Sequence, residues 1–399
     1  MTDTQIGSLS QNPIALLKPS VSFEATAGSL NYTTSLTMRS PVPFYGFRVH
    51  FFNTASNDVI NCTAGAAASR NMTGGVFAAT ETPVQITVGS NAAFTKPAAL
   101  SGGGTGQAIW TDTVSDWVPC VSVPRDDGGA GYLLMVRAFE PSAGNATGNR
   151  CGGHGITPAD VDAYGCATVL SGGGDKTFTN WATFAILLNG LGSAIAVELL
   201  SASNSLTLAT FGDSTIAGQN AAVIGASGAQ LAATGYSSGS RPLVLWNQGE
   251  SSMNSTTYLA LAEKFFATGA QPNIAAMCPY SSNDTDKYTQ AGINRIVGVA
   301  LRFLNECRKA GAIPILLTPV PYTGTTSGEE AFRRQAVVAI KQLAVTYKCG
   351  LVDRDSIYTD YSTAAGGWLP VVIGDGTHPS HAGYVAESAL WTAALAPYF

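Results

Sequence analysis

The hydrophobic pattern of this sequence changes near residue 204, and this change constrains the fold more than any other feature. Before it, short runs such as YGFRVHFFN, PVQITVG and GYLLMVRAFE alternate apolar with polar residues and are separated by Gly, Asn and Pro. This period of two with frequent turn residues is typical of antiparallel strands. We therefore expect a β-sandwich, of jelly-roll-like type, as an accessory domain over residues 1–203.

After residue 204 the pattern is different. Apolar strand-like runs now alternate with longer helical stretches; the runs are SLTLATF, RPLVLWN, PNIAAMCPY, AIPILLTPV and CGLVD. Strands that alternate with helices indicate parallel βαβ units. The sequence thus predicts an α/β fold for residues 204–399, a three-layer α/β/α domain around a parallel sheet.

Two crossover helices are expected in this second part, over residues 287–311 and 327–347. In the second helix, Ser327 and Glu330 have the spacing of a capping box. Apolar residues at helical spacing predict its buried stripe, which consists of Phe332, Ala336, Ile340, Leu343 and Tyr347.

Composition excludes several classes of protein. The chain has 399 residues, 12% of them charged, and a formal net charge of -5, without a basic run that could neutralise phosphates. This argues against a nucleic-acid-binding protein. The sequence contains no run of eighteen apolar residues, so it predicts no membrane span. Its first twenty residues lack the pattern of a signal peptide. Low charge with many Ser, Thr, Gly and Asn residues favours a secreted or particle-surface protein over a cytoplasmic one.

Seven cysteines cannot all pair within one chain. Cys151 and Cys166 flank a Gly-rich segment that could be closed by a disulfide. Alternatively, these two cysteines could bind zinc together with His154, although no fourth ligand stands at a motif spacing. The third possibility is a loop with unpaired thiols.

The sequence contains only four histidines, and one of them, His378, is a candidate catalytic residue. Asp375 stands three residues before His378 in GDGTHPSHAGY, a spacing at which a tight turn can bring a carboxylate to an imidazole. Ser214 lies in FGDST, directly after the apolar run that ends at Phe211. A serine, a histidine base and an orienting carboxylate are the groups that nucleophilic hydrolysis requires.

Four stretches resemble, in order, the sequence blocks of the SGNH (GDSL) hydrolase family. FGDST is similar to the first block, LWNQGESS to the second, PYSSND to the third and DGTHP to the last. The resemblance covers roughly residues 205–399. It implies a serine esterase that needs no metal or organic cofactor.

The resemblance also implies a role for each matching residue. Ser214 would be the nucleophile, His378 the base and Asp375 its orienter. The oxyanion would be bound by the backbone N–H groups of Ser214 and Gly249 and by the side chain of Asn283. Strands of a parallel sheet end at one edge, so these residues can be collected there. One position departs from the family, because Ser281 stands where the third block has glycine.

Two other interpretations of the same stretches remain. GYSSG matches the G-x-S-x-G motif around Ser237, but a helical stretch precedes it and a strand follows it, the reverse of the order that this motif requires. The second alternative takes WNQGES as the Q-G-E block of sialate O-acetylesterase-like proteins. Gln248 would then be the side-chain donor in place of Asn283.

The expected function is hydrolysis of a carboxylic ester, most simply deacetylation of a carbohydrate or polysaccharide, because a β-sandwich beside an esterase often binds glycans. A lipid ester or thioester is the alternative substrate. The non-enzymatic alternative is a surface or particle adhesin with a degenerate hydrolase fold.

Overall fold

The structure is a computed structural model that divides the chain into two compact units. The antiparallel unit comprises Asn12–Ser205 and Thr234–Trp246, and the parallel-sheet unit includes Leu206–Ala233 and Asn247–Phe399. The structure describes residues 14–17, 22–23, 31–53, 57–73, 78–101, 108–141, 151–152, 157–172, 174–178, 181, 188–189, 191–192, 195–222, 226–238, 241–362, 364 and 366–399.

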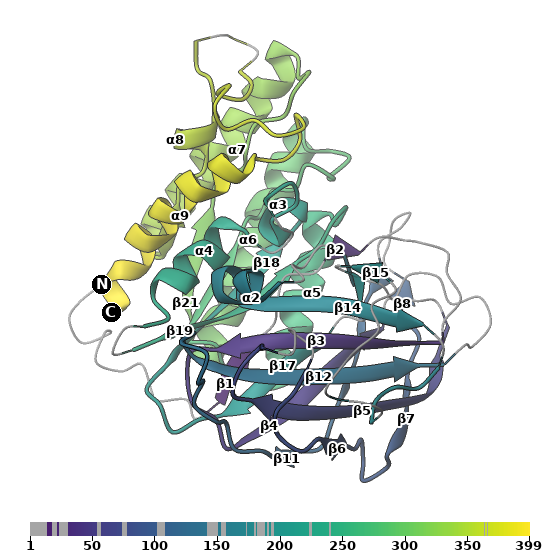
Figure 1. Cartoon of the computed structure of the whole chain (residues 1–399). Coiled ribbons are helices and arrows are strands. Elements are labelled where there is room, and N and C mark those ends of the chain that lie inside the picture. The colour runs from purple at the N-terminus through teal and green to yellow at the C-terminus, as the bar shows by residue number, and fades with distance from the viewer. Residues whose placement is uncertain are drawn as a thin grey trace. The chain divides into compact units, whose positions relative to one another are not determined.

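Two antiparallel sheets form most of the antiparallel unit (Figure 1). One has the order β1-β17-β4-β10, with β11 also paired with β4. Its strands are β1 Ile14–Leu17, β17 Ile195–Leu200, β4 Gly46–Asn53, β10 Thr111–Val114 and β11 Val118–Pro119. The other has the order β15-β14-β3-β12-β5-β6, with β7 paired with β5. Its strands are β15 Leu188–Asn189, β14 Cys166–Gly172, β3 Tyr32–Ser40, β12 Tyr132–Glu140, β5 Val59–Ser69, β6 Val84–Ile86 and β7 Ala93–Lys96.

Shorter elements complete this unit. The strands β2 Ser22–Phe23, β13 Cys151–Gly152 and β16 Leu191–Gly192 pair with one another, as do β8 Leu100–Ser101 and β9 Ala108–Ile109. Helix α2 spans Pro158–Tyr164 and is capped by Thr157. Helix α4 spans Gly228–Gly235, and its residues are divided between the two units.

The two larger sheets share one hydrophobic cluster. Phe47, Val49 and Phe51 of β4 and Val197 and Leu199 of β17 belong to it together with residues of the other sheet, such as Leu36, Met38, Leu134 and Val136. Alternate residues along a strand point to the same face, so each sheet contributes every second residue to this core. The expected antiparallel strands are therefore present before residue 204. The boundary between residues 203 and 204 stays a prediction.

The parallel sheet has the strand order β19-β18-β20-β21-β22. Its strands are β19 Leu243–Gly249, β18 Leu206–Gly212, β20 Ile274–Met277, β21 Ile313–Leu317 and β22 Gly350–Val352. The pairings of β18 with β20, β20 with β21 and β21 with β22 are parallel, which confirms the predicted α/β fold for this part of the chain.

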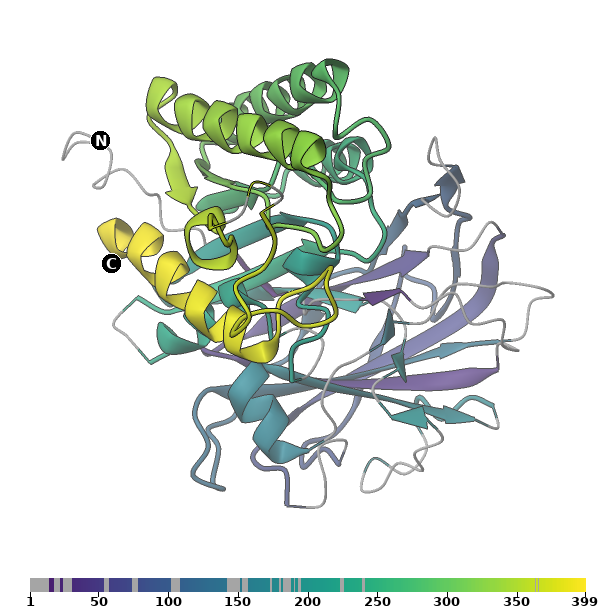
Figure 2. The same ribbon diagram turned by 90° about the horizontal axis from the view of Figure 1, so that it is seen from above.

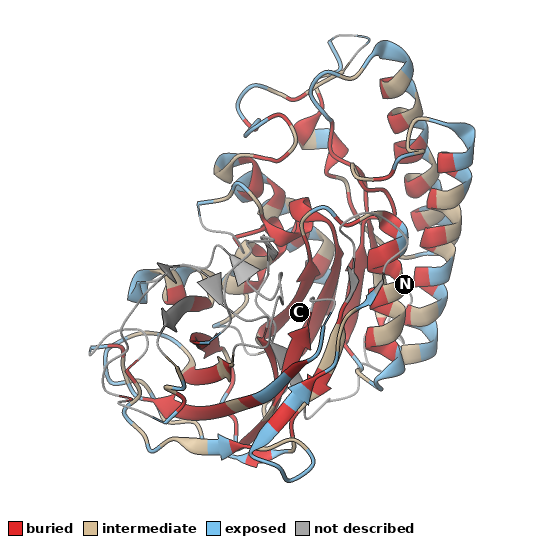
Figure 3. Ribbon diagram, turned by 90° about the vertical axis from the view of Figure 1, so that its right-hand side faces the viewer, coloured by how far each residue is buried: buried red, intermediate tan, exposed pale blue. Residues whose placement is uncertain are grey.

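Helices connect these strands and cover the sheet. They are α3 Ser214–Ala217, α5 Ser255–Ala267, α6 Gln290–Ala310, α7 Ser327–Thr346, α8 Asp355–Tyr358 and α9 His381–Leu395, followed by the 3-10 helix η1 Ala396–Tyr398. Figure 2 shows α9 on one side of the parallel sheet and α6 and α7 on the other. In Figure 3 the strands of the parallel sheet are mostly buried, whereas the long helices bury one face and expose the other.

The two predicted crossover helices are α6 and α7, but the predicted cap and part of the stripe of α7 are wrong. The N-cap is Thr326, which forms a capping box with Glu329, one residue before the predicted pair. Ala336 and Ile340 are buried as predicted, whereas Phe332, Leu343 and Tyr347 are only half-buried. The buried face instead includes Glu330 and Arg333, which pair with each other. Charged residues that pair with each other can therefore lie on the buried face of a helix, where the apolar pattern predicts only hydrophobic residues.

No helix in the described ranges is long and apolar enough to cross a membrane.

A buried histidine lies between two carboxylates in the antiparallel unit. His50 of β4 contacts Asp112 of β10 through Nδ1 and Glu198 of β17 through Nε2, both at 2.7 Å. Burial acts to lower the pKa of His50, but the two carboxylates outweigh it and raise the pKa to about 9. The imidazolium is thus the stable form of this side chain in the folded unit.

This cluster predicts that the antiparallel unit loses stability as the pH rises from about 6.5, the value of an unfolded histidine, to about 9. The folded state holds the proton more tightly in that window, so the free energy of unfolding falls there, by about 3 kcal/mol at most. Urea unfolding curves across this range measure the change. In His50→Gln the decrease should disappear, and a His50 imidazole that titrates below pH 7 by NMR would contradict the prediction.

Candidate active site

Ser214 lies in a turn at the carboxyl end of β18. Asp213 is the N-cap of α3, and its Oδ1 accepts a hydrogen bond of 3.0 Å from the Thr215 N–H. Ser214 is therefore the first residue of α3, where backbone N–H groups have no acceptor within the helix. The serine side chain and an N–H donor are thus presented by the same turn.

His378 and Asp375 form the second part of the site. Asp375 Oδ1 accepts hydrogen bonds of 2.9 Å from the N–H groups of Thr377 and His378, and its Oδ2 lies 2.8 Å from His378 Nδ1. Burial acts to raise the pKa of Asp375, but the hydrogen bonds from His378 and Thr377 outweigh it and lower the pKa. The carboxyl group is therefore an anion at neutral pH.

The ionised carboxylate fixes the tautomer of His378. A carboxylate only accepts hydrogen bonds, so Nδ1 carries the proton and Nε2 has the lone pair. Nε2 lies 2.8 Å from Ser214 Oγ. Ser214 therefore donates to His378 and His378 donates to Asp375, as nucleophilic catalysis by a serine requires.

Two residues outside the turn that contains Asp375 and His378 form hydrogen bonds to it. The Gly376 carbonyl accepts hydrogen bonds from the Trp368 indole at 3.0 Å and from the Thr323 N–H at 2.9 Å. Gly376 has a φ of +89°, a left-handed conformation that favours glycine. The position of His378 thus depends on Trp368 and Thr323 as well as on Asp375.

Asn247 and Gly249 join β19 to the serine turn. Asn247 is fully buried; its Nδ2 donates to the Ile216 carbonyl at 3.0 Å, and its Oδ1 accepts from the Gly249 N–H at 2.8 Å. A Cβ on Gly249 would lie 2.3 Å from Ala217 N. Glycine is therefore needed here because α3 packs directly on it. Its N–H, the predicted oxyanion donor, is engaged with Asn247 in this structure.

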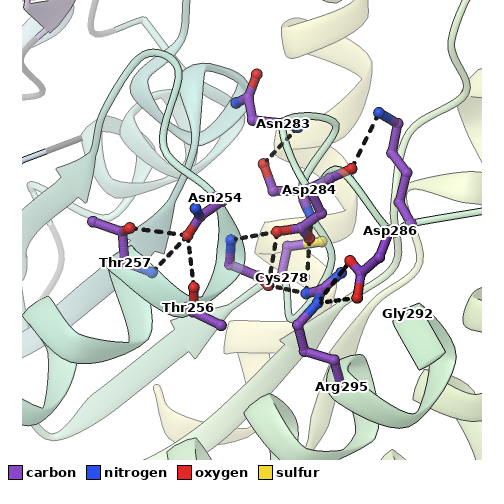
Figure 4. Close-up of polar contacts among 12 residues, drawn as sticks. Asn254, Thr256, Thr257, Cys278, Asn283, Asp284, Asp286, Gly292 and Arg295 are labelled. Carbon is purple, nitrogen blue, oxygen red and sulfur yellow. Dashed lines mark hydrogen bonds and ion pairs between the residues drawn. The ribbon is translucent and has the colours of Figure 1, made fainter. Parts of the chain in front are cut away.

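Asn283 lies in the turn that follows β20. Its Nδ2 donates to the Met253 carbonyl at 3.0 Å, and its backbone N–H donates to Ser281 Oγ at 3.1 Å. Figure 4 shows its side chain pointing away from the charged cluster of Asp284, Asp286 and Arg295. An amide nitrogen carries two hydrogens, so one hydrogen remains for another acceptor.

The rival serine has a different environment. Ser237 lies in a turn after α4, and its hydroxyl donates to the Thr234 carbonyl at 2.7 Å rather than to a histidine. Helix α4 precedes Ser237 and strand β19 follows it, which is the reversed element order that the sequence indicates. Gln248, the alternative oxyanion donor, is buried on β19.

The three interpretations of Cys151 and Cys166, as a disulfide, as zinc ligands together with His154 or as unpaired thiols, stay predictions. His154 lies outside the described residues. Within the part of the chain that the structure describes, no group of three or more His, Cys, Asp or Glu side chains could hold a metal ion.

The structure brings together the serine, the histidine and the aspartate that the sequence indicates, but the sequence does not indicate the residues that hold them. Asn247 begins the N-x-G pattern of the second block, but the pattern alone does not indicate its contacts with the serine turn. Trp368 and Thr323 carry no motif, so only the structure shows their contact with the histidine turn.

No family model matches this chain, and no curated protein matches it. Solved structures do match. A member of the lipolytic protein G-D-S-L family from Veillonella parvula is 14% identical, with a TM-score of 0.38 over 49% of this chain and 98% of that one. A GDSL-like lipase from Bacteroides thetaiotaomicron is 15% identical, with a TM-score of 0.38 over 48% of this chain and 89% of that one.

A third similar structure is a mutant of an acetyl-xylooligosaccharide esterase from Geobacillus. It is 15% identical, with a TM-score of 0.38 over 49% of this chain and 94% of that one. These matches cover about half of this chain.

The packing of Gly249 on α3 predicts that Gly249→Ala destabilises the parallel-sheet unit. The new Cβ would clash with backbone atoms of α3, and such overpacking costs about 1–3 kcal/mol. Urea unfolding measures the loss. Gly298→Ala is the matched control, because a Cβ at Gly298 meets nothing within 4 Å and alanine favours a helix interior by up to about 1 kcal/mol. Equal stability of Gly249→Ala and the wild type would contradict the packing argument.

Proposed function

We propose that this chain is a serine hydrolase that cleaves carboxylic esters. The observation that supports the proposal most is the hydrogen-bonded chain from Ser214 Oγ through His378 to Asp375, with 2.8 Å at each step. The same groups would serve no obvious purpose in an adhesin, because a buried hydroxyl bonded to a buried imidazole contributes nothing to a binding surface.

The reaction follows from the tautomer of His378. As Ser214 Oγ attacks the ester carbonyl carbon, its proton passes to Nε2, and the imidazolium is stabilised by Asp375. His378 then gives this proton to the departing alcohol, which leaves an acyl group on Ser214. Water, activated by the same Nε2, cleaves the acyl-enzyme to release the acid and restore the serine.

The oxyanion needs donors that are already oriented before the reaction. The Ser214 N–H at the start of α3 is one candidate. The second hydrogen of Asn283 Nδ2 is another, because only one is directed to the Met253 carbonyl. The Gly249 N–H would first have to leave Asn247, so we assign Gly249 mainly to packing and only secondarily to oxyanion binding.

For the substrate we propose an acetylated carbohydrate. The two antiparallel sheets share one core, which we interpret as a β-sandwich that serves as a glycan-binding accessory. Acetate release from acetylated glycans, compared with hydrolysis of p-nitrophenyl esters of increasing acyl length, distinguishes this proposal from a lipid-ester or thioester hydrolase. Absence of turnover on all these substrates by folded protein would favour the adhesin.

The proposed nucleophile predicts the outcome of covalent labelling. A fluorophosphonate probe should label Ser214 alone, because among the serines in the described ranges only Ser214 has a histidine to accept its proton. Ser214→Ala should remain folded, lose labelling and lower kcat by at least about 10³-fold. Ser237→Ala is the control and should behave like the wild type, since the Ser237 hydroxyl is bonded to a backbone carbonyl. Labelling of Ser237 in the wild type would refute the assignment.

The oxyanion assignment is tested by comparing two amide side chains. Asn283→Ala should lower kcat by about 10²–10³-fold with little change in KM, because a donor to the transition state is lost. Gln248→Ala should have a much smaller effect on kcat. The opposite ranking, measured by steady-state kinetics on p-nitrophenyl acetate, would move the donor role to Gln248 and favour the Q-G-E interpretation.

A further inference from the structure

Ser281 is a fully buried hydroxyl residue in the turn between β20 and Asn283. Its Oγ lies 2.9 Å from Asp213 Oδ2 and 2.8 Å from the Met253 carbonyl, and it accepts a hydrogen bond of 3.1 Å from the Asn283 N–H. A glycine at this position, as in the family that the sequence resembles, could form none of these bonds. The serine therefore adds a connection that the resemblance does not supply.

One end of this connection is the nucleophile turn. Asp213 uses Oδ1 to bind the N–H and the hydroxyl of Thr215, at 3.0 Å and 2.7 Å, which fixes the first turn of α3. The Thr215 hydroxyl in turn accepts a hydrogen bond of 2.8 Å from the buried Arg354. Asp213 is thus rigidly held on the Ser214 side, and its second oxygen is directed to Ser281.

The other end is the Asn283 turn. The Met253 carbonyl accepts from Asn283 Nδ2, while Ser281 Oγ accepts from the Asn283 backbone. Ser281 has one hydroxyl proton and two possible acceptors; an ionised carboxylate is the stronger acceptor. We therefore assign this proton to Asp213, which leaves the Met253 carbonyl to the Asn283 amide.

The residue after Asn283 is anchored independently. Asp284 accepts hydrogen bonds of 2.9 Å from the N–H groups of Ser255 and Ser281 and forms an ion pair of 3.0 Å with Arg295 (Figure 4). Because Asp284 and Arg295 already hold the turn in place, the Ser281 hydroxyl is not needed to form the turn. The contribution that remains for the Ser281 hydroxyl is to fix the distance between this turn and α3, through its bond to Asp213.

We propose that Ser281 is a positioning residue for the proposed ester hydrolysis. Its hydroxyl couples Asp213, beside the nucleophile, to Asn283, the oxyanion donor, and so sets the spacing between Ser214 Oγ and the Asn283 amide. The inference rests on the proposed function, since spacing of these two groups matters only where an oxyanion forms between them.

The test is a double-mutant cycle on Ser281 and Asn283, with p-nitrophenyl acetate as substrate. Ser281→Ala should lower kcat at least about tenfold while KM changes less than about twofold, because a displaced donor weakens transition-state binding. In the Asn283→Ala background, the same substitution should change kcat less than about twofold, since residues that act through one another are not additive.

Ser282→Ala is the matched control. This neighbouring serine is half-buried and forms no hydrogen bond in the described part of the chain, so its loss should leave kcat and KM unchanged. Should Ser281→Ala fail to fold, Asp213→Asn weakens the same bond from its other end. It should likewise lower kcat at least about tenfold in the wild-type background and less than about twofold with Asn283→Ala.

Two results would overturn the inference. The first is a kcat of Ser281→Ala within about twofold of the wild type, and the second is an effect that multiplies fully with that of Asn283→Ala. Both are distinct from failure of the proposed function, in which the wild type and Ser214→Ala would hydrolyse the ester equally slowly.

Discussion

The hydrogen bond between Ser214 Oγ and His378 Nε2 is the interaction on which the site depends, because it joins residues 164 positions apart in the sequence. It forms only if β18, which leads into the serine, and the turn before α9, which carries the histidine, end at the same edge of the parallel sheet. The parallel pairings of β18 with β20, β20 with β21 and β21 with β22 place the carboxyl ends of β18 and β22 at the same edge, and the chain from β22 leads to the histidine turn. Asn247, Asp213 and Gly376 then fix the two turns through buried hydrogen bonds, so that the fold determines the geometry of the chemistry.

Much of this arrangement could be predicted from the sequence, because it depends on local patterns. The change of period near residue 204 distinguishes antiparallel strands from βαβ units, and the parallel pairings confirm the second of these. Ser214 stands in one short motif, and Asp375 and His378 stand together in another, in which a single backbone turn sets their spacing. Asp375 reaches His378 because the two residues are three positions apart, and this spacing can be read from the sequence without tertiary information.

The features that could not be predicted are those that depend on contacts between distant residues. Two partners of the Ser281 hydroxyl, Asp213 and the Met253 carbonyl, are 68 and 28 residues away, and nothing in PYSSND indicates them. The cap of α7 shows the same limit at short range. Ser327 with Glu330 and Thr326 with Glu329 have the same spacing, and Glu330 is instead drawn into a buried ion pair with Arg333. The engaged N–H of Gly249 likewise follows from the rotamer of Asn247, which no motif specifies.

The most direct measurement of the central claim is the identity of the covalent intermediate. When the wild-type protein is mixed with p-nitrophenyl acetate and quenched within the first turnover, mass spectrometry should show one acetyl group per chain, located on Ser214, together with a burst of one equivalent of p-nitrophenol. Release of p-nitrophenol without a burst and without acetylation of Ser214, or acetylation of another residue at the same rate, would contradict the account.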